Sequence, residues 1–239
     1  MNRRHDAAKI RAAAVREQTD RPSQRRCAED PDALRASRVA LPFEVRAKGT
    51  APTVAGFASV TDTPYEMWDM FGPYTEVVLG SAFDATLEAN PLVEFTVNHG
   101  AGGGLPMAHT RNQTLGLEVV KDADTTGLRY QATVDGSRSD VSDMLKAMER
   151  GDLAEASFKF RIVKGQWSPD WMEYHIEEVD LDRGDVSAVN FGANPHASSG
   201  VVKHAADKPS VTAAPVAIPV EDTARRVLIT DADTRRRTA

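Results

Sequence analysis

His99 stands at a position where a general base would be accessible, at the end of the apolar segment PLVEFTVN. It is in phase with Phe95 and Val97, so its imidazole is expected at the edge of the apolar face of a predicted strand. The glycine-rich loop 100–104 follows at once and adds backbone freedom with little bulk beside the ring. This setting suits a base that a substrate must approach, while a lone histidine here is equally compatible with a structural role.

Ser157 lies in the segment AEASFKFRIV, shortly after a turn at Gly151. The alternating pattern puts Ala156 and Phe158 on the buried face of a strand and the Ser157 hydroxyl on the other face. A serine held rigidly at the edge of a cleft can act as a nucleophile. The alternative is a strand serine whose hydroxyl bonds only water or backbone.

A serine and a histidine that act together need a carboxylate to orient the imidazole and to stabilise its cation during acyl transfer. Asp185, in the segment DVSAVNF, lies close to an acidic stretch over residues 177–182. From composition alone, Asp182 and Glu178 rank beside Asp185 for this role.

Other chemistries find less support in the sequence. Loop 100–104 lacks the Gly-Lys-Ser/Thr that completes a phosphate-binding loop, and no G-x-S-x-G segment is present to form a nucleophile elbow. We expect neither a metal nor another cofactor, because no metal-ligand spacing links the candidate ligands His99, His109, His175, His196 and Cys27. Cys27 is the single cysteine, so an internal disulfide is excluded.

The segments that carry these residues are mostly predicted strands. Period-2 alternation with flanking turn residues predicts strands over 93–97, 115–119, 128–134, 156–162, 174–181 and 185–191. Two helices are also predicted, one over 82–89 with Ser81 as its cap and one that Ser139 or Asp140 caps and Gly151 closes. Together they indicate an α+β domain built on a mainly antiparallel β-barrel or curled sheet.

Charge and composition divide the chain into three parts. We expect a flexible basic leader over residues 1–40 with a solvated helix near 5–19, a folded domain over 41–200, and a flexible tail over 201–239. The net charge is +5 for residues 1–50, −13 for 51–200 and +2 for 201–239. The acidic middle argues against a direct nucleic-acid role and would suit a basic peptide. No apolar run is long enough to span a membrane.

An ordered series of short motifs resembles the prohead maturation protease family of tailed phages. The series covers about residues 41–197 and reads FASV, VVLGSAF, VEFTVNH, LPMAHTRNQTLGLEV, GLRYQATV, SFKF and DVSAVNFGANPHA. The resemblance implies a serine endopeptidase whose fold is like that of the herpesvirus assemblins, a barrel of about seven strands ringed by a few helices. It also implies Ser157 as nucleophile, His99 as base and Asp185 as third member. Two departures lie near that site. Lys159 replaces a usual glycine, which leaves the catalytic atoms intact, and Asp185 is one methylene shorter than the usual glutamate, which changes its reach to His99.

The resemblance further implies the setting in which the protein works. Its substrates would be the scaffold region of the major capsid protein and its own flanks, inside the assembling prohead in the host bacterial cytoplasm, and a homo-oligomer is left open. A second hypothesis is a catalytically inactive scaffold or assembly protein of the prohead. A third is an unrelated β-barrel binding module, which predicts that Ser157 and His99 lie far apart.

Overall fold

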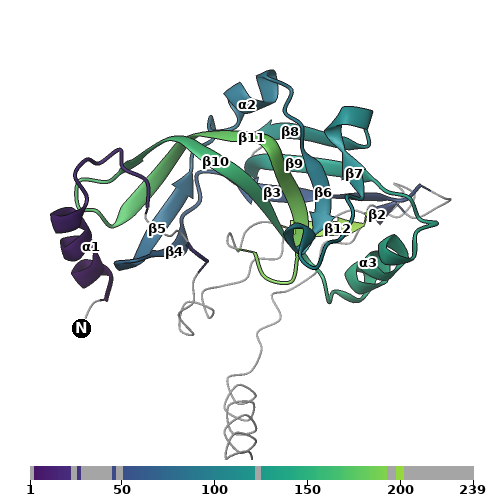
Figure 1. Cartoon of the computed structure of the whole chain (residues 1–239), viewed down its shortest axis with the longest axis horizontal. Helices are drawn as coiled ribbons and strands as arrows, with labels where there is room; N and C mark the ends of the chain where they lie inside the picture. The colour runs from purple at the N-terminus through teal and green to yellow at the C-terminus, as the bar shows by residue number, and fades with distance from the viewer. Residues whose placement is uncertain are drawn as a thin grey trace, which may run out of the picture. The chain divides into compact units, whose positions relative to one another are not determined.

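The computed structural model describes residues 3–22, 26–27, 45–46, 51–121, 125–192 and 198–201. The fold is α+β, as predicted, and all of the described strands belong to two sheets (Figure 1). Most neighbouring strands are antiparallel, and two pairings are parallel. Among the described residues no closed barrel is found, so the barrel remains a prediction.

The first sheet has seven strands. Ser157 and Asp185 lie in two of them, and His99 lies in the turn that follows a third. Its central strand β11 pairs with β10 along one edge and, through separate halves, with β5 and β6 along the other. The strands are β1 (Arg26–Cys27), β4 (Tyr65–Asp69), β5 (Gly72–Val78), β6 (Glu94–Val97), β7 (Ala108–His109), β10 (Glu155–Trp167) and β11 (Glu173–Val189).

The second sheet has five strands and packs with the first around the hydrophobic core. Its members are β2 (Val45–Arg46), β3 (Thr53–Val60), β8 (Leu115–Lys121), β9 (Thr126–Thr133) and β12 (Ser198–Val201). The helices are α1 (Arg3–Ala14), α2 (Asp84–Glu88) and α3 (Ser139–Arg150), with 3-10 turns η2 (Asn98–Gly100) and η3 (Thr110–Asn112). No helix in the described ranges is long and apolar enough to cross a membrane.

Helix α3 has the predicted extent and end, but the assignment of Ser139 or Asp140 as its cap is wrong, because the position before the helix is Arg138 and its side chain makes no capping bond. The helix buries Val141, Met144 and Met148, which recur at helical spacing, and Gly151 closes it with a φ of 79°. Helix α2 is shorter than predicted, and the assignment of Ser81 as its cap is wrong. The position before α2 is Phe83, whose side chain makes no capping bond. Phe83 is fully buried in the hydrophobic core.

The two strands predicted over 174–181 and 185–191 form one strand, β11, which is irregular in the middle. Lys159 lies opposite Asp185, but Arg161 lies opposite Asp180, so β11 contains extra residues between the two pairs. Gly184 lies in this bulge, and a Cβ there would stand 2.0 Å from the Lys159 carbonyl oxygen. Bulges of this kind re-aim side chains beside functional sites. Here the bulge directly precedes Asp185.

Helix α1 falls where the sequence predicts a helix, but it packs on the first sheet rather than standing alone in solvent. It contacts β5, and its buried residues are Ala7, Ala8 and Arg11. The expected boundary of the leader at residue 40 stays a prediction, as does the tail beyond residue 201, which lies outside the described residues. What the structure adds is that the first part of the leader is docked.

Candidate active site

The register of three neighbouring strands gathers polar side chains on one face of the first sheet. Ser157 of β10 pairs with Ser187 of β11, which in turn pairs with Thr96 of β6. Directly paired residues share a face, and their Cα atoms lie about 4.5–5.5 Å apart in an antiparallel ladder. A second polar row, two residues away, contains Lys159 and Asp185.

The opposite face of the same strands is apolar and fixes these directions. Phe158, Val186 and Phe95 form the row between the two polar rows, and all three are buried. The ring of Phe158 packs edge-on against Phe83, with 5.6 Å between ring centroids. Because Phe158 must face the core, its neighbour Ser157 must face the polar side.

His99 and Asp185 are in direct contact. The His99 Nδ1 atom lies 2.7 Å from Asp185 Oδ1. The imidazole is 33% exposed and the carboxylate only 3%. An ionised carboxylate can only accept, so in the neutral ring this bond requires the proton on Nδ1 and leaves Nε2 as an acceptor. This is the arrangement that a general base needs.

The backbone that carries His99 is strained. Asn98 and His99 both have positive φ values, 49° and 57°, in the left-handed region that side chains other than glycine rarely adopt. Two bonds hold this turn: His99 N–H donates to Ser187 Oγ at 2.8 Å, and the Asn98 side chain accepts from Asn190 N–H at 3.1 Å. Such strain persists only where the surroundings fix it, and it is concentrated at functional sites.

Ser187 was not singled out from the sequence, yet it joins the elements of the site. It is fully buried, and its hydroxyl lies 2.5 Å from Thr96 Oγ1 as well as bonding the His99 amide. Ser187, which lies opposite Ser157, therefore connects Thr96 of β6 with the turn that carries His99. Its burial and its two partners make it a positioning group rather than a nucleophile. The sequence pattern that could have identified Ser187 is its alternation with Val186 and Ala188, in phase with Asp185.

Lys159 occupies the second oxygen of the carboxylate. Its Nζ atom lies 3.1 Å from Asp185 Oδ2 and 3.4 Å from the His99 carbonyl oxygen. Asp185 thus has the imidazole on one oxygen and an ammonium group on the other. The ammonium is 59% exposed, so solvent screens its charge.

The alternative carboxylates are engaged elsewhere. Asp182 Oδ1 accepts from Leu92 N–H at 2.9 Å, and Glu178 pairs with Lys164. Asp180 pairs with Arg161 beside the bulge, and the guanidinium hydrogen bond holds the pKa of Asp180 below its usual range. Of the acidic residues in this stretch, Asp185 is the one in contact with His99.

Ser157 is half-buried on the strand beside this pair. Within the described residues its hydroxyl forms no hydrogen bond with His99. Catalytic hydrogen bonds of free enzymes frequently form only when substrate binds. The relevant observation is therefore that the strand of Ser157 pairs directly with the strand of Asp185. The described residues contain no cluster of three or more histidine, cysteine or acidic side chains that could hold a metal ion.

A serine and a buried aspartate on adjacent strands, with a histidine in the turn after a third strand, are the kinds of group that serine hydrolases use. The family model of the caudovirus prohead serine proteases matches residues 41–210, more than two thirds of the chain. The chain belongs to this family, so it is a phage serine protease of capsid maturation. The match starts where the predicted domain starts and extends ten residues beyond its predicted end at 200. Comparisons with curated proteins and with solved structures gave no match.

Proposed function

We propose that this chain is a serine endopeptidase that cleaves the scaffold region of the major capsid protein inside the assembling prohead, and cleaves its own flanks. The observation that carries the proposal is the bond between His99 and Asp185 next to the strand of Ser157. Family membership supports the reaction class and the capsid setting. The place of action is then the prohead within the host bacterial cytoplasm.

In the proposed mechanism Ser157 is the nucleophile. His99 Nε2 takes the hydroxyl proton as Oγ attacks the scissile carbonyl, and the tetrahedral intermediate collapses to an acyl-enzyme. The proton passes from His99 to the leaving amine. Water then enters, His99 takes one of its protons, and attack on the acyl carbon releases the second product and restores the Ser157 hydroxyl.

Asp185 fixes the ring of His99 through Nδ1 and compensates the charge of the imidazolium. Its own burial makes this effective, because the carboxylate lies in a region of low dielectric constant. The oxyanion of the intermediate needs backbone N–H donors. We place these in loop 100–104 or in the backbone beside Ser157. The loop is open, since no atom lies within 4 Å of a Cβ built at Gly100, Gly102, Gly103 or Gly104.

The flanks are proposed as substrates because they are basic while the domain is acidic, with net charges of +5 and −13 for residues 1–50 and 51–200. Opposite charge raises the local concentration of a flexible basic segment near the domain. The same attraction would act on basic segments of the capsid protein. Mass spectrometry of assembled particles tests self-cleavage, and intact termini in active protein contradict it.

The decisive test is the Ser157→Ala variant co-expressed with the major capsid protein. We expect no processed capsid protein, with the variant itself folded as judged by circular dichroism and thermal unfolding. The matched control is Ser81→Ala, since Ser81 is exposed and distant in sequence from the site. Undiminished processing by Ser157→Ala would contradict the proposal. Loss of processing in both variants would assign the effect to something other than the nucleophile.

A further inference from the structure

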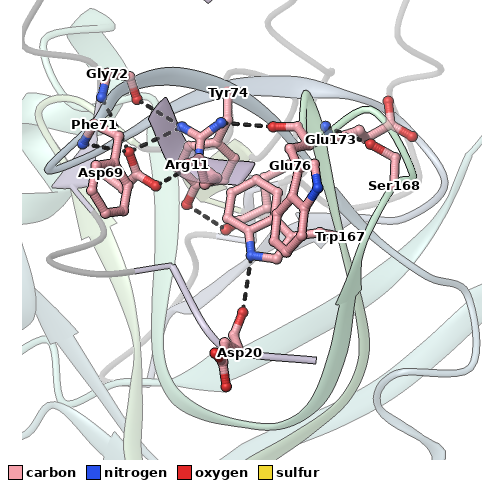
Figure 2. A network of polar contacts seen from close by, with 11 residues as sticks. Arg11, Asp20, Asp69, Phe71, Gly72, Tyr74, Glu76, Trp167, Ser168 and Glu173 are labelled. Atoms are coloured by element: carbon pink, nitrogen blue, oxygen red, sulfur yellow. Dashed lines mark hydrogen bonds and ion pairs between the residues drawn. The ribbon is translucent and has the colours of Figure 1, made fainter. Parts of the chain in front are cut away.

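A second buried ion pair lies at the other end of the β10–β11 hairpin, where α1 docks. Arg11 of α1 bonds the carboxylate of Asp69 at the end of β4, from Nε to Oδ2 at 2.8 Å and from Nη2 to Oδ1 at 3.0 Å (Figure 2). Both side chains are inaccessible, with exposed fractions of 0% and 1%. This bidentate ion pair, with two parallel N–H···O bonds, is the strongest contact that arginine makes with a carboxylate.

The rest of the guanidinium is surrounded by carbonyl groups and rings. Nη1 donates to the Trp171 carbonyl at 2.7 Å, and Nη2 lies 3.3 Å from the Gly72 carbonyl. The charge stands 4.5 Å from the ring centroid of Trp167 and 5.4 Å from that of Tyr74 (Figure 2). Asp69, Gly72, Tyr74, Trp167 and Trp171 form a pocket for one arginine, which we call the arginine cradle.

The surface beside the arginine cradle is shaped for the small residues of α1. Gly72 has a φ of 129°, and a Cβ there would stand 2.9 Å from the Cβ of Ala7. Ala7 and Ala8 are buried together with Arg11 on the same side of the helix. A helix face with alanines and one arginine therefore fits where a bulkier face would not.

The segment after α1 is attached as well. The backbone N–H of Trp167 donates to the Gln18 carbonyl at 2.7 Å, and Trp167 Nε1 donates to the Asp20 carbonyl at 2.9 Å. At the start of the helix, Arg4 pairs with Glu66 of β4. Residues 3–22 thus contact β4, β5 and the end of β10 at three separate points, all remote in sequence.

We propose that the arginine cradle is a peptide-binding site, and that it keeps residues 3–22 bound to the folded domain after the backbone between β1 and β2 is cut. All the contacts described join the segment to residues beyond 65, so none depends on an intact chain between them. The ligand class is a short helix that presents small residues and one arginine. The proposal concerns the bound state of the leader and does not depend on the proteolytic mechanism.

The test uses the full chain with a recognition sequence for a site-specific protease inserted within residues 28–44. The Ser157→Ala background removes any self-cleavage, and a fluorescent label is placed at the amino terminus. After complete cutting, shown by denaturing electrophoresis, the label is followed by gel filtration and by anisotropy on dilution in about 0.5 M salt, which screens exposed charges but not a buried pair. We expect the label to stay with the domain. Separate elution would overturn the proposal.

Variants in the released segment leave the domain itself unchanged. Arg11→Met removes one partner of a buried pair and should weaken retention about a hundred- to thousandfold. Ala7→Leu should also weaken it, because Gly72 leaves no room. The matched controls are Arg16→Met and Ala13→Leu, which alter exposed residues of the same segment. Retention of Arg11→Met as strong as that of the unaltered segment would show that the cradle does not bind the peptide.

Discussion

Two buried aspartates, Asp69 and Asp185, stand at opposite ends of the β10–β11 hairpin and have different surroundings. Asp69 faces a guanidinium that is itself inaccessible, and the turn amides of Phe71 and Gly72 donate to the same carboxylate. Asp185 faces an imidazole that is 33% exposed and an ammonium that is 59% exposed. Two buried carboxylates therefore differ in their partners, which are inaccessible to solvent at Asp69 and partly exposed at Asp185.

The difference shows what distinguishes a closed ion pair from an accessible one. In the arginine cradle every direction around Arg11 is filled by an acceptor or a ring, so no further group can approach. At the other end His99 uses Nδ1 for Asp185 and keeps Nε2 free of the carboxylate. A polar group becomes available for chemistry when its fold fixes one side of it and leaves the other side open.

The largest expected effect on activity comes from replacing Asp185 with asparagine. Asp185→Asn should lower kcat/KM for a capsid-derived peptide by about 10⁴-fold, because an amide no longer fixes the tautomer of His99. Its effect on stability should be small, since Lys159 can turn to solvent. The measurement is steady-state hydrolysis beside thermal unfolding. Activity within tenfold of the unaltered protein would place the orienting carboxylate elsewhere.

Asp69→Asn should show the reverse. It leaves the buried charge of Arg11 uncompensated, which costs about 3–5 kcal/mol in the stability of the docked helix. Hydrogen exchange should show α1 losing protection, while kcat/KM per folded molecule changes less than threefold. A loss of activity as large as that of Asp185→Asn, with α1 still protected, would contradict the separation of the two ends.

Ser187→Ala tests whether the Ser187 hydroxyl positions the turn that carries His99. Removing this hydroxyl leaves the His99 amide without its acceptor and Thr96 without its partner, which costs about 1–3 kcal/mol. We expect kcat to fall about tenfold or more with KM little changed, because the misplaced ring affects the chemical step. The conservative variant Ser187→Thr should restore part of kcat. An unchanged kcat in Ser187→Ala would remove the positioning role.

Lys159→Met carries the smallest expected effect. The ammonium shares Asp185 with the imidazole, but the Lys159 side chain is 59% exposed, so solvent screens its charge. Its removal should therefore change kcat/KM for a capsid-derived peptide by less than about threefold. The control is Lys164→Met, a lysine of the same strand that pairs with Glu178. A loss of more than tenfold in Lys159→Met alone would show that Lys159 takes a larger part in the site than an exposed ion pair does.

Local patterns in the sequence account for part of the candidate site. Alternation along β10 predicted which way Ser157 points. The expectation that His99 continues the apolar phase of Phe95 and Val97 is wrong, because β6 ends at Val97 and His99 lies in the following turn, from which it contacts Asp185. The choice among the acidic residues needed the motif DVSAVNF, because composition could not separate Asp185 from Asp182. A resemblance resolved what periodicity left open.

The rest depends on contacts remote in sequence. Helix α1 reads as solvated because its buried face contains alanines and an arginine, and the carboxylate that accepts Arg11 lies 58 residues away. The continuity of β11 was missed because Gly184 and the turn around it resemble a strand break. For Ser187 the sequence showed only that it alternates with apolar residues, since its partners Thr96 and the His99 amide lie far away in the chain. No local pattern contains such pairings.

The central position of β11 also determines when the site can assemble. β11 spans Glu173–Val189 and supplies Asp185 and Ser187, while β6 and β10, which carry the other groups, precede it in the chain. During synthesis, His99 and Ser157 leave the ribosome well before the strand that joins them. A nascent chain therefore has no complete site, and competence arrives only as the last strand of the first sheet emerges.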